Sequence, residues 1–308
     1  MANVTVTDPS NGKGPVSARS LNAIATLGAV ETHQIRISAS GEEAKLVLSA
    51  LKVLIQDNFG EPPVTSPMEE QLLQVNKMKA GSGTQKAVPI SEGIALAPLY
   101  KHQASRPSIP THLAENPESE WTRLQAALES TSREITLLAR RMKQSIGSSE
   151  GAIFDAHLLI LQDPDLIKAA RAGIDERHEN AAFAWNAAIN SAAESYRALD
   201  DSYLQARAAD VEDVGTQVLF AMTDKSTQSA LTFNGPVILY ATDLTPTETS
   251  QLDMQMVLGI ITAGGGPTSH SAILSRALGI PAVAGVGTLL ERQPGGTLTG
   301  INGFTGEI

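Results

Sequence analysis

The sequence contains no cysteine, and aromatic residues make up only 4% of its 308 positions. The lack of cysteine excludes disulfides, thiolate zinc sites and cysteine nucleophiles, and it fits a reducing cytoplasm. The few aromatic residues argue against a base-stacking surface for single-stranded nucleic acid. No apolar run reaches the ~18 residues of a membrane span, and the first twenty residues lack a secretory apolar segment. We therefore expect a soluble, cytoplasmic protein.

Basic residues are outnumbered by acidic ones, 23 to 33, which gives a net charge of −10. An acidic protein repels the phosphate backbone, so nucleic acid is not expected as a partner. The charge is uneven: residues 113–222 hold 18 acidic and 10 basic side chains, a difference of −8. This stretch is either a solvated outer face or a docking surface for a basic partner. The length predicts about two or three domains, and the 42% hydrophobic content is enough to form buried cores.

The first sixty residues predict a small α+β unit with strands at 4–7 and 33–39 and helices at 19–27 and from residue 42. In the first helix we expect Leu21, Ile24 and Ala25 to face inward. The second helix has an apolar stripe that should pack on the sheet: Ala44, Val47, Leu48, Leu51, Leu54 and Ile55. With three short strands at most, this unit has an open sheet edge and looks incomplete.

The remainder predicts a β/α domain interrupted by a helical bundle. Residues 61–86 are interpreted as a linker, 87–112 and 223–308 as the β/α domain, and 113–222 as the helical subdomain. Within the bundle, helix breaks are expected at 147–149, 162–164, 179–180 and 200–201. The first long helix has a core-facing stripe of residues: Trp121, Leu124, Leu128, Thr131, Ile135, Leu138 and Met142. Strands are expected at 236–241, 256–263 and 282–285, and Thr245 with Glu248 forms a capping box.

His270 is the histidine whose surroundings indicate chemistry. Three glycines at 264–266 allow a sharp turn out of a strand, and Pro267 follows them. Thr268, Ser269 and His270 then lie on the first turn of a helix predicted at 269–278. The positive end of a helix favours a neutral, nucleophilic imidazole, and its N–H groups can hold an anion on the ring. The alternative is an ordinary glycine turn with an incidental histidine. Because no two histidines have the spacing of a zinc pair, we expect no metal site.

The segment 264–283, GGGPTSHSAILSRALGIPAV, resembles the phosphohistidine signature of the phosphoenolpyruvate-utilising enzymes. Three further segments make the resemblance one to Enzyme I of the bacterial sugar phosphotransferase system: AIFDAHLL at 152–159, LDDSYLQARAADV at 199–211 and DLTPTET at 243–249. The resemblance covers about 85–308. It implies a swivelling β/α phosphohistidine domain with an inserted helical subdomain that docks the small phosphocarrier HPr.

This resemblance also implies roles for individual residues. His270 would be phosphorylated, and Thr249 would hydrogen-bond its ring. Gly265, Gly266, Thr268 and Ser269 would form the phosphate cradle. His157 and Arg207 match positions in or near the docking helices, although plain packing within the bundle explains them equally well. No cofactor is expected on this chain, because phosphoenolpyruvate and magnesium bind a barrel of the upstream Enzyme I, and the chain ends before such a barrel.

The first sixty residues resemble the second half of HPr, through SNGK at 10–13, SARSL at 17–21 and LG at 27–28. The first strand, first helix and active histidine of HPr have no counterpart here, and His33 stands at the wrong place. An HPr-like module joined to a phosphohistidine domain without a barrel resembles the phosphotransfer subunit of dihydroxyacetone kinases. That resemblance implies phosphoryl uptake from Enzyme I and HPr and delivery to the kinase's nucleotide-binding subunit. The alternatives are a fragment of Enzyme I, another multiphosphoryl transfer protein, or a non-catalytic HPr-binding regulatory module.

Overall fold

The computed structural model describes residues 2–60, 87–103, 107–145, 147–223, 233–267 and 269–308. The predicted linker at 61–86 and Thr268 lie outside these ranges. The chain forms two compact units. The first comprises Met1–Asn76, Ile109–Gln125 and Leu159–Gly215, and the second comprises Lys77–Ser108, Ala126–Leu158 and Thr216–Ile308. Both units take part of the helical region.

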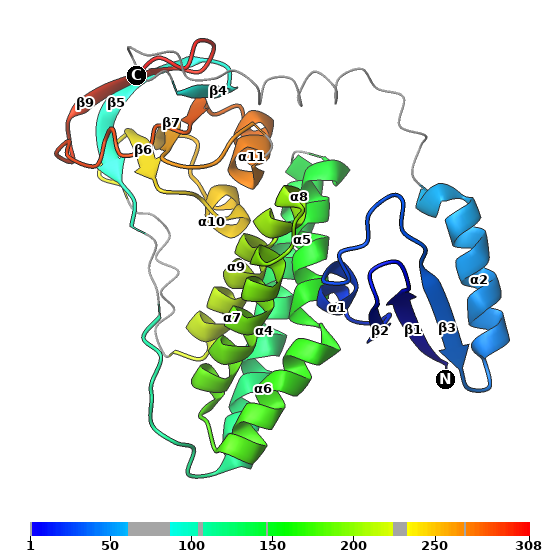
Figure 1. Cartoon of the computed structure of the whole chain (residues 1–308). Coiled ribbons are helices and arrows are strands. Elements are labelled where there is room, and N and C mark those ends of the chain that lie inside the picture. Colours follow the sequence, from blue (N-terminus) through cyan, green and yellow to red (C-terminus); the bar gives the residue numbers. More distant parts are fainter. Residues whose placement is uncertain (1, 61–86, 104–106, 146, 224–232, 268) are drawn as a thin grey trace. The chain divides into compact units, whose positions relative to one another are not determined.

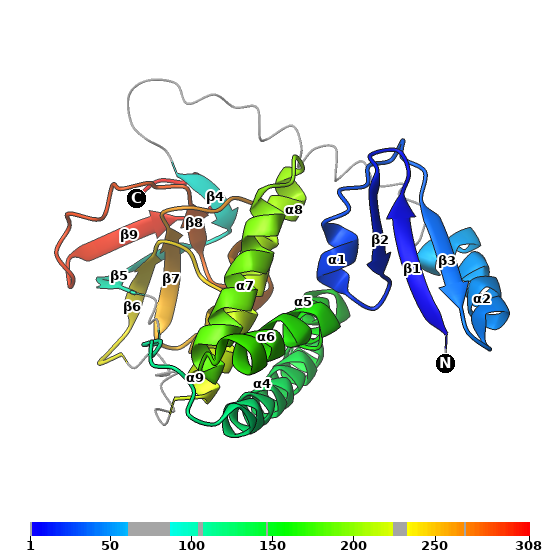
Figure 2. The same cartoon turned by 60° about the horizontal axis from the view of Figure 1, so that its bottom comes forward.

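The N-terminal module, residues 2–60, is a three-stranded antiparallel sheet with two helices (Figure 2). The strands are β1 (Asn3–Asp8), β2 (Lys13–Ser17) and β3 (Arg36–Ser40), in the order β2-β1-β3. Helix α1 (Leu21–Ala25) lies beside β2, α2 (Ala44–Gln56) packs on β3, and a short 3-10 turn, Asn58–Gly60, follows. The strands predicted at 4–7 and 33–39 are present, while β2 was not predicted.

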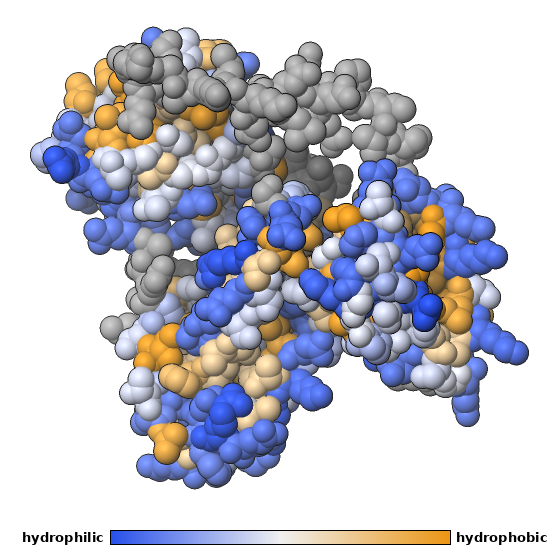
Figure 3. Space-filling view, viewed as in Figure 1, coloured by the Kyte–Doolittle hydropathy of each residue, from blue (hydrophilic) through white to orange (hydrophobic). Residues whose placement is uncertain are grey.

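One expectation about this module is wrong. In α1 the buried residue is Asn22, whereas Ile24, expected to face inward, is 38% exposed. Helix α2 packs on the sheet as expected, but none of its residues is fully buried. The reason is that α2 rests on β3, an edge strand of a small sheet, so the contact is narrow. Apolar side chains such as Leu46 and Val53 therefore remain at the surface. Figure 3 shows orange patches over the module.

The helical region begins with α4 (Pro117–Ser145), whose predicted stripe is largely buried, with Leu124 and Ile135 fully inside. It continues with α5 (Ser148–Leu161), α6 (Pro164–Arg177), α7 (Ala181–Arg197), α8 (Ser202–Ala206) and α9 (Ala208–Ala221). Asp163, Asn180 and Asp201 cap α6, α7 and α8 with their side chains, at three of the breaks expected from the sequence.

The second unit contains a six-stranded sheet in the order β4-β8-β7-β6-β5-β9 (Figure 1). Its parallel centre consists of β5 (Ile94–Lys101), β6 (Val237–Ala241), β7 (Val257–Thr262) and β8 (Ala282–Ala284). The edge strands β4 (Val88–Ser91) and β9 (Leu298–Asn302) run antiparallel to their neighbours. Apolar clusters pack on the sheet, as the continuous apolar runs of β6 and β7 predict. Strand β9 was not predicted, because Gly300 and Asn302 interrupt its short apolar pattern.

Helices α10 (Pro246–Ser250) and α11 (His270–Leu278) follow β6 and β7 and contact each other. Because β6 and β7 are parallel neighbours, the loops at their carboxyl ends lie side by side, as in the ligand sites of other α/β sheets. The predicted capping box of Thr245 and Glu248 is present on α10. Gln217 of α9 donates a buried hydrogen bond of 2.9 Å to Thr247 of α10. This hydrogen bond attaches α10 to helix α9.

Candidate functional site

The glycine loop between β7 and α11 turns at Gly265, whose φ of +78° is one that residues with a side chain rarely adopt. On one side of the turn, the Thr262 hydroxyl donates to the carbonyl of Gly264 at 2.8 Å. On the other side, the guanidinium of Arg276, from the last turn of α11, donates to the carbonyl of Pro267 at 2.8 Å. The loop is thus held by the strand before it and by the helix after it.

Ser269 is the N-cap of α11. Its hydroxyl accepts from the N–H of Ala272 at 3.3 Å and donates to the carbonyl of Gly266 at 2.9 Å. The hydroxyls of Ser269 and Ser271 are 3.0 Å apart. His270 is the first residue of the helix and is half-buried. The expectation that the histidine stands at a helix start is confirmed, and part of the residue reaches solvent.

The start of α11 favours negative charge beside His270. The first N–H groups of an α-helix have no acceptor within the helix, and they carry the positive end of its dipole. The cap of Ser269 uses the N–H of Ala272, further along the first turn. A transferred phosphate on the ring of His270 would therefore meet main-chain donors and a favourable dipole.

Asp243, in the loop after β6, lies close enough to His270 for their charges to interact. Desolvation of the carboxyl raises the pKa of Asp243, although the residue as a whole is exposed. Hydrogen bonds from the N–H of Leu244, at 2.8 Å, and from the side chain of Ser271, together with the charge of His270, oppose that rise. Asp243 was not singled out from the sequence as a site residue. Its position depends on the side-by-side loops of β6 and β7, which the sequence order alone does not reveal.

Thr249 and Glu248 stand on α10. The Thr249 side chain is fully buried, and its hydroxyl donates to the carbonyl of Thr245 at 2.9 Å, which leaves the oxygen's lone pairs as acceptors. Glu248 accepts from a ring nitrogen of His102 at 2.8 Å. Burial by itself would raise the pKa of Glu248, but the hydrogen bonds from His102 and from the N–H of Thr245 outweigh it and hold the pKa below its usual value.

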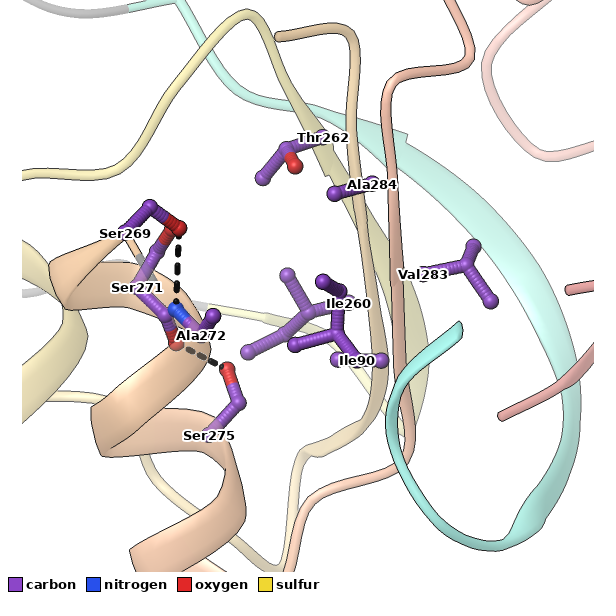
Figure 4. Close-up of a pocket in the computed structure, with 10 residues that line it drawn as sticks. Ile90, Ile260, Thr262, Ser269, Ser271, Ala272, Ser275, Val283 and Ala284 are labelled. Carbon is purple, nitrogen blue, oxygen red and sulfur yellow. Dashed lines mark hydrogen bonds between the residues drawn. The ribbon is translucent and has the colours of Figure 1, made fainter. Parts of the chain in front are cut away.

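A small cavity of about 10 Å³ lies between the start of α11 and the sheet (Figure 4). It has room for about one water molecule at most. Its polar lining consists of four hydroxyl side chains: Thr262, Ser269, Ser271 and Ser275. A cavity of this size does not enclose a sugar or phosphoenolpyruvate.

The two expected docking residues differ in exposure. The His157 side chain, on α5, is fully buried, with its ring edge-on to Phe154 at 5.8 Å between centroids. Its burial corresponds to the packing alternative. Arg207 is partly exposed and stacks on the ring of Tyr203, 4.5 Å from the centroid, while it pairs with Asp210 at 3.0 Å. Tyr203 itself is 66% exposed.

Among the described residues, no group of three or more histidine, aspartate or glutamate side chains is arranged to hold a metal ion. In the same residues, no helix combines the length and apolar character needed to cross a bilayer.

Three family models match successive parts of the chain. The model "PTS HPr component phosphorylation site" matches residues 1–57. "PEP-utilising enzyme, N-terminal" matches 86–207, and "PEP-utilising enzyme, mobile domain" matches 233–306. The third match contains the glycine loop, α10 and α11. The three models therefore show a chain in which an HPr-like module precedes phosphoenolpyruvate-utilising domains.

Two curated relatives and a solved structure show the same similarity to phosphoenolpyruvate-utilising proteins. A phosphoenolpyruvate-protein phosphotransferase of Enterococcus faecalis is 34% identical over 224 residues, 72% of this chain and 39% of the relative. A multiphosphoryl transfer protein of Rhodobacter capsulatus is 33% identical over 305 residues, 97% of this chain and 37% of the relative. A solution structure of Enzyme I superposes with a TM-score of 0.55 at 32% identity, over 72% of this chain and 91% of that structure.

The chain belongs to the Enzyme I family of phosphoenolpyruvate-utilising enzymes. Its β/α domain and helical bundle are those of the Enzyme I N-terminal region, and its small sheet is HPr-like. The chain spans less than two fifths of the length of the curated relatives it matches.

Proposed function

We propose that this chain is a phosphoryl carrier that accepts a phosphoryl group on His270 from a phosphohistidine donor. The observation that carries this proposal is the placement of a half-exposed imidazole at the N-terminus of α11, after a glycine turn. HPr and Enzyme I act upstream in this proposal, and the whole relay takes place in the cytoplasm.

The transfer exchanges one P–N bond for another. A nitrogen lone pair of His270 attacks phosphorus in line with the donor's P–N bond, and the donor leaves as its imidazole. The chain's contribution is position and electrostatics: N–H groups of α11 face the transferred oxygens, and the hydroxyl oxygen of Thr249 accepts from the other ring nitrogen of His270. Gly266 leaves the approach open, since a Cβ there would meet no atom within 4 Å.

The experiment that tests the carrier is phosphoryl uptake from labelled phosphoenolpyruvate in the presence of Enzyme I and HPr. Acid-labile, base-stable label on the wild-type chain is expected, and His270→Ala should carry none. His112→Ala, which removes an exposed histidine elsewhere, is the matched control and should label normally. Equal labelling of His270→Ala and wild type would contradict the proposal.

We further propose that the phosphoryl group is destined for dihydroxyacetone, through the nucleotide-binding subunit of its kinase. The support is the resemblance in module order, an HPr-like module followed by the phosphohistidine domain. The second candidate is a multiphosphoryl transfer protein for another sugar, favoured by the match to the Rhodobacter capsulatus protein over 97% of the chain. Labelled chain offered the kinase subunit with dihydroxyacetone, or membranes containing sugar permeases, separates the two by which acceptor removes the label.

A further inference from the structure

A buried carboxylate, Asp163, joins the N-terminal module to the helices of its own unit. The Ser20 hydroxyl, the Asn22 N–H and the Asn22 side-chain amide all donate to the same oxygen of Asp163, at 3.0, 2.9 and 2.9 Å. The other oxygen of Asp163 caps α6 by accepting from the N–H of Asp165 at 2.9 Å. One oxygen therefore stabilises the helix, and the other binds the module.

All three residues at this contact are buried: Ser20 is 0% exposed, Asp163 1% and Asn22 7%. A carboxylate is removed from water at a large cost unless charged hydrogen bonds replace its hydration. Here the replacement comes from the module, so the contact depends on Ser20 and Asn22. It also explains why α1 buries a polar asparagine where its sequence pattern predicts apolar residues.

A second contact lies next to α8. A Cβ at Gly28 would be 3.6 Å from a methyl carbon of Leu199, so the segment after α1 packs against the turn between α7 and α8. Helix α8 carries Tyr203 and leads directly to Arg207. The module therefore also contacts the turn that leads into α8, the helix that carries Tyr203.

Tyr196 is affected by charges at both the Asp163 contact and the Arg207–Tyr203 pair. Its phenol is buried, which raises its pKa to about 12, and the charges of Asp163, Asp210 and Arg207 all act on it. Asp163, to which the module binds, and Arg207 therefore both act on the same buried phenol.

We propose that the N-terminal module is a tethered occupant of this helical surface, held by Ser20 and Asn22 on Asp163, and that a free HPr-like carrier must displace it to dock. The displacement of the module by a carrier rests on the proposed function, which gives the chain such a carrier as partner. The module matches the HPr model over residues 1–57. Module and carrier are therefore related, and in this proposal they compete for one surface.

The competition is unequal because the module is part of the same chain. An intramolecular occupant acts at an effective concentration far above that of a separate protein. The apparent affinity for a free carrier is consequently reduced by the fraction of molecules in which the surface is covered. Weakening the module's contact should therefore strengthen carrier binding, the reverse of what damage to a docking surface does.

Asn22→Asp in the full chain tests the proposal. This isosteric change places a second carboxylate against Asp163, while an acidic residue in the first turn of α1 is compatible with that helix. Asn3→Asp is the matched control: the same change on the exposed face of β1 in the same module. Hydrogen exchange of the amides in 20–28 reports on the contact, and calorimetric titration with unphosphorylated HPr reports on docking.

We expect Asn22→Asp to speed exchange of the 20–28 amides and to tighten HPr binding by about tenfold, as ~1.4 kcal/mol of relieved competition would. Asn3→Asp should leave both measurements at wild-type values. Slow exchange that persists in Asn22→Asp overturns the role of Asp163, and unchanged or weaker HPr binding with fast exchange overturns the competition. Neither measurement involves phosphoryl transfer, so a failure to label His270 would contradict the proposed function without imitating either result.

Discussion

In the proposed carrier, two residues of the loop and helix that follow β6 act on His270. Asp243 interacts with the imidazole through its charge, and Thr249 supplies a buried hydroxyl whose proton is used by the Thr245 carbonyl. Because that proton is committed, the Thr249 oxygen can act only as an acceptor toward a further donor. In the proposed carrier that donor would be an N–H of the His270 ring, and the other ring nitrogen would keep its lone pair for phosphorus.

Thr249→Val should slow the phosphorylation of His270 up to about tenfold, the effect of losing one hydrogen bond of ~1.4 kcal/mol. Thr249→Ser retains the hydroxyl and should restore most of the rate. Initial rates of label uptake from phosphorylated HPr, measured at several carrier concentrations, are the readout. We expect the change in kcat, with KM for the carrier nearly constant. An equally slow Thr249→Ser would show that packing of the methyl group matters, and not the hydroxyl.

At the scale of elements, the glycine loop and α11 act as one assembly. Arg276, near the end of α11, returns to the Pro267 carbonyl, and its guanidinium also donates to Ile90 of β4 at 3.3 Å. Gly279 ends the helix in a left-handed conformation, as its sequence position predicts. Both ends of a nine-residue helix are therefore capped, which compensates for its short length.

Substitution by alanine should have different effects at the adjacent glycines Gly265 and Gly266. Gly265→Ala places a side chain at φ +78° and 3.4 Å from the Ser269 hydroxyl, so it should lower the free energy of unfolding by about 1–2 kcal/mol. Gly266→Ala meets no atom within 4 Å and should leave stability unchanged, while its methyl group slows uptake from the bulky protein donor. Thermal unfolding and label uptake separate the two effects. A Gly266→Ala variant with the full uptake rate would show that the donor does not approach over this residue.

At the scale of the whole molecule, charge is concentrated where the partner is proposed to dock. The acidic excess of 18 over 10 in residues 113–222 lies on the helices, and exposed acidic residues such as Asp200 stand beside α8. Opposite charges on two proteins raise the rate of encounter, and salt removes this advantage, because the screening length falls from ~10 Å at 0.1 M to ~3 Å at 1 M.

Uptake of the phosphoryl group from HPr should therefore fall as salt rises, by about tenfold or more in kcat/KM between low salt and 1 M. Asp200→Asn should reduce kcat/KM at low salt and have no effect at high salt. Glu31→Gln makes the same kind of change at an exposed residue of the N-terminal module and is the matched control. A rate independent of salt would contradict electrostatic steering by the helices.

Local rules in the sequence determined much of this protein. Asp163, Asn180 and Asp201 mark helix starts because a short acceptor side chain satisfies the first N–H groups. The capping box of α10 and the helix start at His270 follow from equally local patterns. These features depend on residues three or four positions apart, so no knowledge of the fold is needed to predict them.

Only the tertiary structure decided which faces are covered and which loops meet. Asn22 is buried, and Ile24 is not, because Asp163 lies 141 positions away along the chain and yet accepts both hydrogen bonds of Asn22. Asp243 joins His270 because β6 and β7 are neighbours in the sheet. Contacts of this kind result from strand order and from the packing of modules. The hydrophobic pattern of a single helix or strand predicts neither of these.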